Sequence, residues 1–247
     1  MSGTRSPAKE PEDEGPREFV KYSFYQLQPE WRRLPAEERR TGRERLSALL
    51  DAPPAGLILR TYSTVGTRGD ADFALWMIAP DLGQIQEFHA RILGTPMGGY
   101  LTSAYSYLGM ARRSEYLGEH AVSASDGSRR RPFDLPYLFV YPFVKKREWY
   151  SIPFEERQRM MGEHFRIGHH FPRVQIHTGY SFGLDDPEFI LAFEAEWPGE
   201  FLDLVQELRP SEASRYTELE TPIFTCLRVS PTRMLELAEG LPSTTTD

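Results

Sequence analysis

The sequence has one cysteine, Cys226, among 247 residues, which excludes an internal disulfide and a cysteine-rich metal site. It has no apolar run close to the roughly 20 residues that a membrane-spanning helix needs. Basic residues are not in surplus, because 36 Asp and Glu against 29 Lys and Arg give a formal net charge of −7. A nucleic-acid-binding protein usually carries the opposite balance. The first residues also lack the apolar core of a signal peptide, so we expect a cytoplasmic protein with no membrane span and no nucleic-acid partner.

The composition is that of a folded protein, with 40% hydrophobic and 13% aromatic residues. Two stretches differ from the rest: residues 1–16 predict a disordered arm, and residues 121–136 predict a linker. The signatures HExxH, CxxC and GxSxG are missing, as are phosphate-loop and dinucleotide-binding glycine patterns. This removes most enzyme classes that a short motif would identify.

The same order of predicted elements occurs twice, in residues 17–120 and in residues 137–230. Alternating aromatic and apolar residues predict strands, and a proline followed by two glutamates predicts the start of a helix. The first half is predicted to contain strand 19–27, helix 35–50, strands 57–64 and 71–78, helix 82–93 and strand 104–111. The second half is predicted to contain strand 137–144, helix 153–171, strands 173–182 and 188–194, helix 199–208 and strand 223–229.

Sequence similarity between the halves favours a duplication. Residues 30–39 align with residues 148–157, and Tyr62-Ser63 aligns with Tyr180-Ser181 at the same offset of 118. The alternative is chance recurrence of a common helix start, but two separate matches at one offset argue against it. Each half is therefore predicted to be a ferredoxin-like unit, and the chain an α+β fold in which both units form one dimeric α+β barrel. Residues 231–247 are expected to form a short helix and a tail.

The first helix of the second half carries a histidine, His164, where the first half has Leu46. His164 lies on a helical stripe with Met160, Ile167, Gly168 and Phe171, so it interrupts an apolar face. Such a histidine is often a core residue bonded to a backbone carbonyl. A neutral imidazole is also the usual axial ligand of haem iron, and Gly168 would let a flat group approach the helix. The pattern alone leaves both interpretations open.

Further residues of the second half carry a resemblance to the chlorite dismutase superfamily of haem proteins, which includes coproheme decarboxylases. They are Tyr141-Pro142-Phe143-Val144-Lys145, Trp149-Tyr150, Pro153, Glu156-Arg157, Met161, His164, Gly168, Gly183-Leu184-Asp185-Asp186, Phe189, Arg209, Glu212-Ala213-Ser214 and Tyr216. The resemblance implies haem b or iron coproporphyrin III in residues 137–230, none in residues 17–120, and a homo-oligomer, often a ring of five.

Carried over to this sequence, the resemblance implies His164 as the iron ligand and Glu212 as its hydrogen-bond partner. Lys145 and Ser214 match positions that anchor propionates, and Trp149 matches a tryptophan near the porphyrin. Trp149 recurs as Trp31 in the first half and can equally serve the fold, and Arg209 and Tyr216 are as readily structural as functional.

The distal side distinguishes the possible reactions. Chlorite dismutases place an arginine in the strand before the Gly-Leu-Asp-Asp turn, where this sequence has Ile176. Strand alternation predicts that Val174, Ile176 and Thr178 share one face and that Gln175 and His177 point the other way. A slip of one residue would bring Gln175 or His177 into that place, and neither is arginine. An apolar distal site favours a coproheme decarboxylase that uses hydrogen peroxide. Tyr141 matches the reactive tyrosine of those enzymes, so the resemblance implies that a Tyr141 radical takes hydrogen from a propionate.

Two alternatives to this reaction stay open. One is a chlorite dismutase or general haem peroxidase, with an arginine that reaches the pocket from elsewhere. The other is a haem-binding or haem-delivery protein without catalysis. The decarboxylase also uses a distal histidine from the linker region as a proton source, and the only histidine of that stretch is His120.

Overall fold

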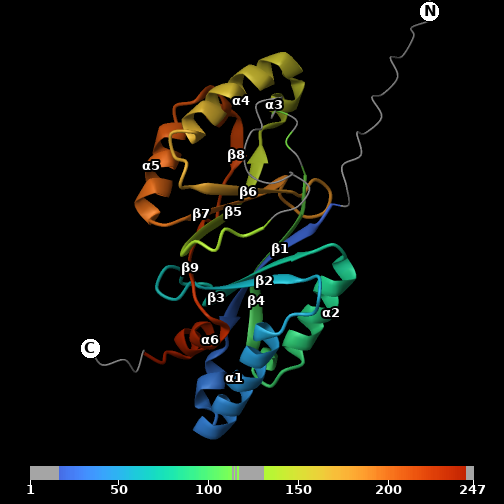
Figure 1. Cartoon of the computed structure of the whole chain (residues 1–247), viewed down its shortest axis with the longest axis vertical. Helices are drawn as coiled ribbons and strands as arrows, with labels where there is room; N and C mark the ends of the chain where they lie inside the picture. The colour runs from blue at the N-terminus through green and yellow to red at the C-terminus, as the bar shows by residue number, and fades with distance from the viewer. Residues whose placement is uncertain (1–16, 113, 115, 117–130, 243–247) are drawn as a thin grey trace, which may run out of the picture.

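The computed structural model describes residues 17–112, 114, 116 and 131–242 (Figure 1). The predicted arm 1–16, most of the predicted linker 121–136 and His120 lie outside the described residues. Among the described residues, no helix has the length and apolar character that crossing a membrane would require.

The first half follows the predicted order of elements. It contains β1 (Phe19–Leu27), η1 (Pro29–Arg33), α1 (Ala36–Asp51), β2 (Ile58–Ser63), β3 (Phe73–Ala79), α2 (Leu82–Leu93), η2 (Gly98–Tyr100) and β4 (Leu101–Ala111). β1 and α2 have the predicted bounds, and β4 starts three residues earlier than predicted.

The second half repeats this order with a few additions. It contains β5 (Tyr137–Lys145), α3 (Arg147–Ser151), α4 (Phe154–Gly168), β6 (Gln175–Tyr180), β7 (Phe189–Ala195), α5 (Pro198–Leu208), η3 (Glu212–Tyr216), β8 (Thr217–Leu219), β9 (Phe224–Arg228) and α6 (Pro231–Glu239). The sequence did not predict α3, η3 and β8. α4 ends at Gly168 rather than at Phe171, because the chain turns there and the backbone N–H groups of residues 169 and 170 bond back to the last turn.

The strands form one sheet that closes on itself. Their order is β7-β6-β4-β1-β3-β2-β9-β5-β8, and β7 also pairs with β5, so that β8 alone lies outside the closed barrel. The halves are joined by β2 with β9 and by β4 with β6, both antiparallel. This confirms the predicted α+β fold of two ferredoxin-like units in one barrel.

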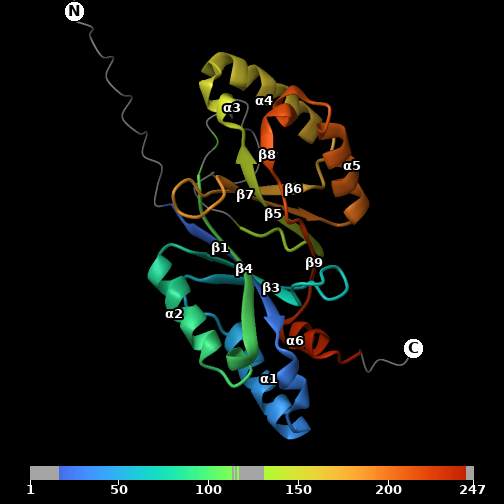
Figure 2. The same ribbon diagram turned by 180° about the vertical axis from the view of Figure 1, so that it is seen from behind.

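Each strand places alternate side chains inside the barrel and under the helices. The interior holds aromatic residues from both halves, such as Phe24 and Phe224, whose ring centroids are 3.8 Å apart. The helices cover the outer face: α1, α2 and α6 lie at one end of the molecule and α3, α4 and α5 at the other (Figures 1 and 2). The last helix, α6, thus returns to the first half, where it contacts α1, β1, β2 and β3.

Candidate functional site

Three aligned positions between the helices and the sheet carry apolar residues in the first half and other residue types in the second. In the first half all three are leucines with almost no exposed surface. In the second half the residues are a lysine, a histidine and a glycine, all half-buried. The pairs are Leu27 with Lys145, Leu46 with His164, and Leu50 with Gly168. The second half therefore lacks three apolar side chains that fill the space between helix and sheet in the first half.

The apolar side chains reflect this difference. Under the helices of the first half they form one continuous group, which includes Trp31, Leu46 and Leu50 and is completed by Met234 and Leu235 of α6. In the sequence, α6 follows the last strand of the second half. The corresponding segment of the first half follows β4, and it forms no helix in the part of the chain that the structure describes.

In the second half the apolar side chains form two separate groups. One lies around Phe139, Tyr141, Phe193 and Phe201, and the other contains Trp149, Met160 and Ala213.

His164 lies on α4 between these two groups. Met160, one turn before it, belongs to one group, and Ile167 and Phe171 pack against the other. Burial, with a smaller effect of the Lys145 charge, lowers the pKa of His164 to about 4, so its imidazole is neutral at neutral pH. Among the described residues its ring nitrogens have no hydrogen-bond partner. This distinguishes His164 from a core histidine bonded to a carbonyl.

Lys145 ends β5 with its ammonium turned toward the second apolar group. Nζ donates a hydrogen bond of 2.7 Å to the carbonyl of Ala213 and lies 4.5 Å from the centroid of the Trp149 ring. Burial lowers the pKa of Lys145 to about 8, although the carboxylates of Glu188 and Glu220 oppose the shift. A half-buried cation whose one acceptor among the described residues is neutral has capacity for an anionic ligand.

Tyr141 lies four residues before Lys145, on the same face of β5. Its ring stacks on that of Phe193 with centroids 6.0 Å apart. Burial raises the pKa of Tyr141, and the charge of Glu220 adds to the rise while Arg209 opposes it. Arg209 forms an ion pair with Glu220, which gives Arg209 a structural partner. Because its pKa is raised, the Tyr141 phenol keeps its proton at neutral pH.

β6 presents Ile176 on the helix-covered face, paired across the sheet with Phe193, and Ile176 is 47% exposed. His177 points into the barrel interior, where its Nε2 lies 2.8 Å from an Oε2 of the buried Glu194. The alternation that places Ile176, and not Gln175 or His177, on the helix-covered side is thus the one predicted.

Three other predicted residues lie on α4 itself or on η3, which contacts α4. The carboxylate of Glu212 is 44% exposed and bonds to Arg159 at 2.5 Å, so this structure does not pair Glu212 with His164. The reason is that Arg159 on α4 offers Glu212 a charged partner in solvent. Ser214 is half-buried in η3. A Cβ added to Gly168 would meet no atom within 4 Å, so the helix surface there is not covered.

Comparison with known proteins agrees with this geometry. The family described as "Chlorite dismutase" matches residues 39–229. Coproheme decarboxylase of Mycolicibacterium smegmatis is 36% identical over 177 residues, which cover 71% of this chain and 75% of that protein. The chain belongs to the chlorite dismutase family. It is thereby an enzyme of a haem-dependent family, which confirms the resemblance seen in the sequence.

Solved structures of chlorite dismutase from Candidatus Nitrospira defluvii share the fold. A double mutant is 26% identical, with a TM-score of 0.80 over 90% of this chain and 95% of that one. A second mutant, with arginine replaced by alanine, reaches a TM-score of 0.81 at 24% identity and the same coverage, and shows the fold alone.

Sequence reasoning missed one residue that contacts the candidate site. Tyr116, which follows β4, contacts Trp149 and Phe154, and its hydroxyl accepts a hydrogen bond of 2.8 Å from Arg157. No periodic pattern includes Tyr116, so only the tertiary structure could reveal it.

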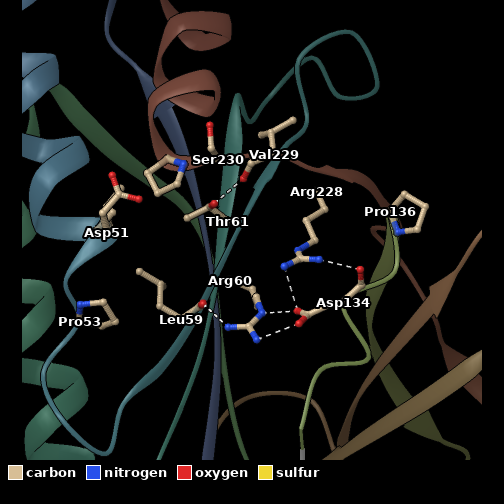
Figure 3. A pocket seen from close by; sticks show the side chains of 12 residues that line it. Asp51, Pro53, Leu59, Arg60, Thr61, Asp134, Pro136, Arg228, Val229 and Ser230 are labelled. Carbon is tan, nitrogen blue, oxygen red and sulfur yellow. Dashed lines mark hydrogen bonds and ion pairs between the residues drawn. The ribbon is translucent and has the colours of Figure 1, made fainter.

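A cavity of about 690 Å³ lies elsewhere, between β2, β9 and residues 134–136 (Figure 3). Arg60 and Arg228 line it, and both form ion pairs with Asp134. The guanidinium groups of both arginines are thus directed at Asp134. No residue predicted for the haem site lines this cavity.

Proposed function

We propose that the second half of the chain binds an iron porphyrin through His164 and that the enzyme removes carbon dioxide from propionates of iron coproporphyrin III with hydrogen peroxide. One observation carries the proposal. Three buried leucines of the first half are replaced by Lys145, His164 and Gly168, which provide a cation, a neutral imidazole and an uncovered helix surface at one place.

The residues fit an iron porphyrin better than a free metal ion. Among the residues that the structure describes, no group of three or more His, Cys, Asp or Glu could hold a metal. A porphyrin supplies four nitrogen ligands itself and needs one neutral imidazole from the protein. His164 is neutral because its pKa is lowered to about 4, and its ring nitrogens have no hydrogen-bond partner among the described residues.

The polar residues around His164 suit a ligand that carries carboxylates. Lys145 offers a charge-assisted hydrogen bond to a propionate, and Ser214 in η3 offers a hydroxyl. Trp149 supplies a buried aromatic surface beside Lys145. These three residues would orient the substrate relative to Tyr141, four residues from Lys145 on the same strand face.

When bound, the iron porphyrin supplies the reactivity toward peroxide. In the net reaction, each propionate with one hydrogen peroxide and one proton gives a vinyl group, carbon dioxide and two waters. Tyr141 is the residue that we assign to hydrogen transfer: its phenol is protonated at neutral pH, so Oη can give up a proton and an electron and then take hydrogen from the propionate. The ring stacked on Phe193 fixes its position.

Ile176 supports this reaction over chlorite dismutation. An oxychlorine anion would need a guanidinium on the distal side, and β6 offers an aliphatic side chain there. The haem b alternative, the ring of five copies and the cytoplasmic location remain predictions. Sedimentation of the loaded protein tests the oligomeric state.

The decisive experiment is reconstitution with iron coproporphyrin III, titration with peroxide and mass spectrometry of the porphyrin. We expect two successive losses of carbon dioxide. The Tyr141→Phe variant should bind the porphyrin with the same Soret band as the wild type. It should release no carbon dioxide. A porphyrin that is only bleached by the wild-type protein would contradict the proposal, and oxygen release from chlorite would then identify a dismutase.

A further inference from the structure

We propose that Tyr116 is a positioning residue of the porphyrin site, which acts through Trp149 to hold the Lys145 ammonium where it meets a propionate. The inference rests on the proposed function in one respect, the role of Lys145 as an anchor. It goes beyond the proposed function by giving a role to a residue that follows β4, the last strand of the first half.

Contacts with α4 and with Trp149 hold Tyr116 against the second half. Its hydroxyl accepts a hydrogen bond of 2.8 Å from Nη1 of Arg157 on α4. Its ring stacks on Phe154, with centroids 5.8 Å apart and an interplanar angle of 13°. The same ring meets Trp149 edge-on at 6.3 Å. These geometries lie in the range of favourable aromatic pairs, so the position of Tyr116 is well determined.

Trp149 transmits this position to Lys145. The indole is buried between Tyr116 and Tyr216, whose ring centroid lies 5.5 Å away. Lys145 Nζ lies over the indole at 4.5 Å and bonds to the Ala213 carbonyl. The ammonium also lies 5.3 Å from the centroid of the Phe143 ring. A displaced indole would therefore remove the nearer of the two aromatic contacts that direct the ammonium.

The first half shows why Trp149 needs this support. A Cβ at Gly42 would lie 2.5 Å from Cη2 of Trp31, so Trp31 packs against α1 only because that position has no side chain. α4 carries Met160 at the aligned position, and Trp149 shares an apolar group with it. Trp149 cannot approach its helix as Trp31 does, and the ring of Tyr116 covers it instead.

The test is a double-mutant cycle with metal-free coproporphyrin III as the probe, its binding followed by fluorescence. The metal-free probe separates this inference from iron ligation by His164. We expect Lys145→Met and Tyr116→Ala each to weaken binding about tenfold, the size expected when a hydrogen bond to a charged group is lost. The double variant should bind no more weakly than Lys145→Met, because Tyr116 acts only through that residue.

The first half provides a matched control. Tyr100 contacts Trp31 at 5.4 Å, so Tyr100→Ala removes an equivalent aromatic contact away from Lys145 and should leave porphyrin affinity unchanged. Tyr116→Phe keeps the ring and should bind within about twofold of the wild type. Tyr116→Leu replaces the alanine variant if that one does not fold.

Additive losses in the double variant, or a tenfold loss in Tyr116→Phe, would overturn the inference. Wild-type affinity in Lys145→Met would overturn both it and the anchor role of Lys145. The carbon dioxide assay of the wild-type protein remains an independent test of the proposed reaction.

Discussion

His164 and Leu46 occupy the same position in the first long helix of the two halves, yet only Leu46 is part of a continuous apolar core. Around Leu46, the apolar side chains of α1, the sheet and α6 fill the available space. Around His164, the corresponding side chains form two groups that do not join. The gap between these two groups lies where we propose that the porphyrin binds.

Replacement of His164 by leucine, the residue at the aligned position 46, tests the different roles of the two positions. His164→Leu should abolish the Soret band of the reconstituted protein while the apoprotein melts at a temperature equal to or above that of the wild type. The leucine adds apolar contacts, worth about 1–2 kcal/mol if it is as buried as Leu46. Absorbance titration and thermal unfolding measure the two effects. A retained Soret band would remove His164 as the ligand.

The lowered pKa of His164 predicts a pH dependence of the apoprotein. Between pH 4 and 6.5 the unfolded chain binds a proton at this histidine and the folded chain does not. The free energy of unfolding should therefore rise with pH across this window, and the contribution is lost as the pH falls. Urea unfolding at several pH values measures it, with His164→Leu as the reference. If the free energies of unfolding of the two proteins changed equally with pH, the lowered pKa of His164 would be contradicted.

Ile176→Arg should change the ligand preference of the loaded protein. β6 would direct the new guanidinium to the helix-covered face, where it can bond to an anion on the distal side of the porphyrin. We expect azide to bind about tenfold more tightly than to the wild type. The control is Gln175→Arg, whose side chain belongs to the opposite face of the strand. Equal affinities in both variants would disprove the placement.

The buried pair of His177 and Glu194 should contribute strongly to stability. Glu194 has no exposed surface and accepts hydrogen bonds from His177 and from the backbone N–H groups of Phe133 and Leu135. Glu194→Ala leaves these donors without a partner and should lower the free energy of unfolding by at least about 3 kcal/mol.

The exposed pair of His170 and Glu207 provides the comparison for Glu194. Its atoms are 2.9 Å apart, close to the spacing of the buried pair, but both side chains are in solvent. Glu207→Ala should therefore cost less than about 0.5 kcal/mol. Denaturant unfolding distinguishes the two, and similar losses would show that burial is not the cause.

Local patterns in the sequence were sufficient for several features of the site. The period of apolar residues gave the bounds of β1 and α2, and the alternation in residues 174–178 placed Ile176 and His177 on opposite faces of β6. The offset of 118 between the halves identified His164 as the residue that replaces Leu46. These features depend on neighbours within one element, and a periodic pattern records such neighbours directly.

Features that depend on distant contacts were decided by the tertiary structure alone. The sequence predicted a short last helix but not that α6 packs on the first half, because its apolar stripe fits any apolar face. It did not show that Arg159 would take the carboxylate of Glu212, or that Tyr116 would cover Trp149. A side chain on a short or irregular segment chooses its partner by three-dimensional proximity, which no spacing along the chain encodes. The sequence therefore determined the fold and the iron ligand that we propose, and the tertiary structure determined what surrounds that ligand.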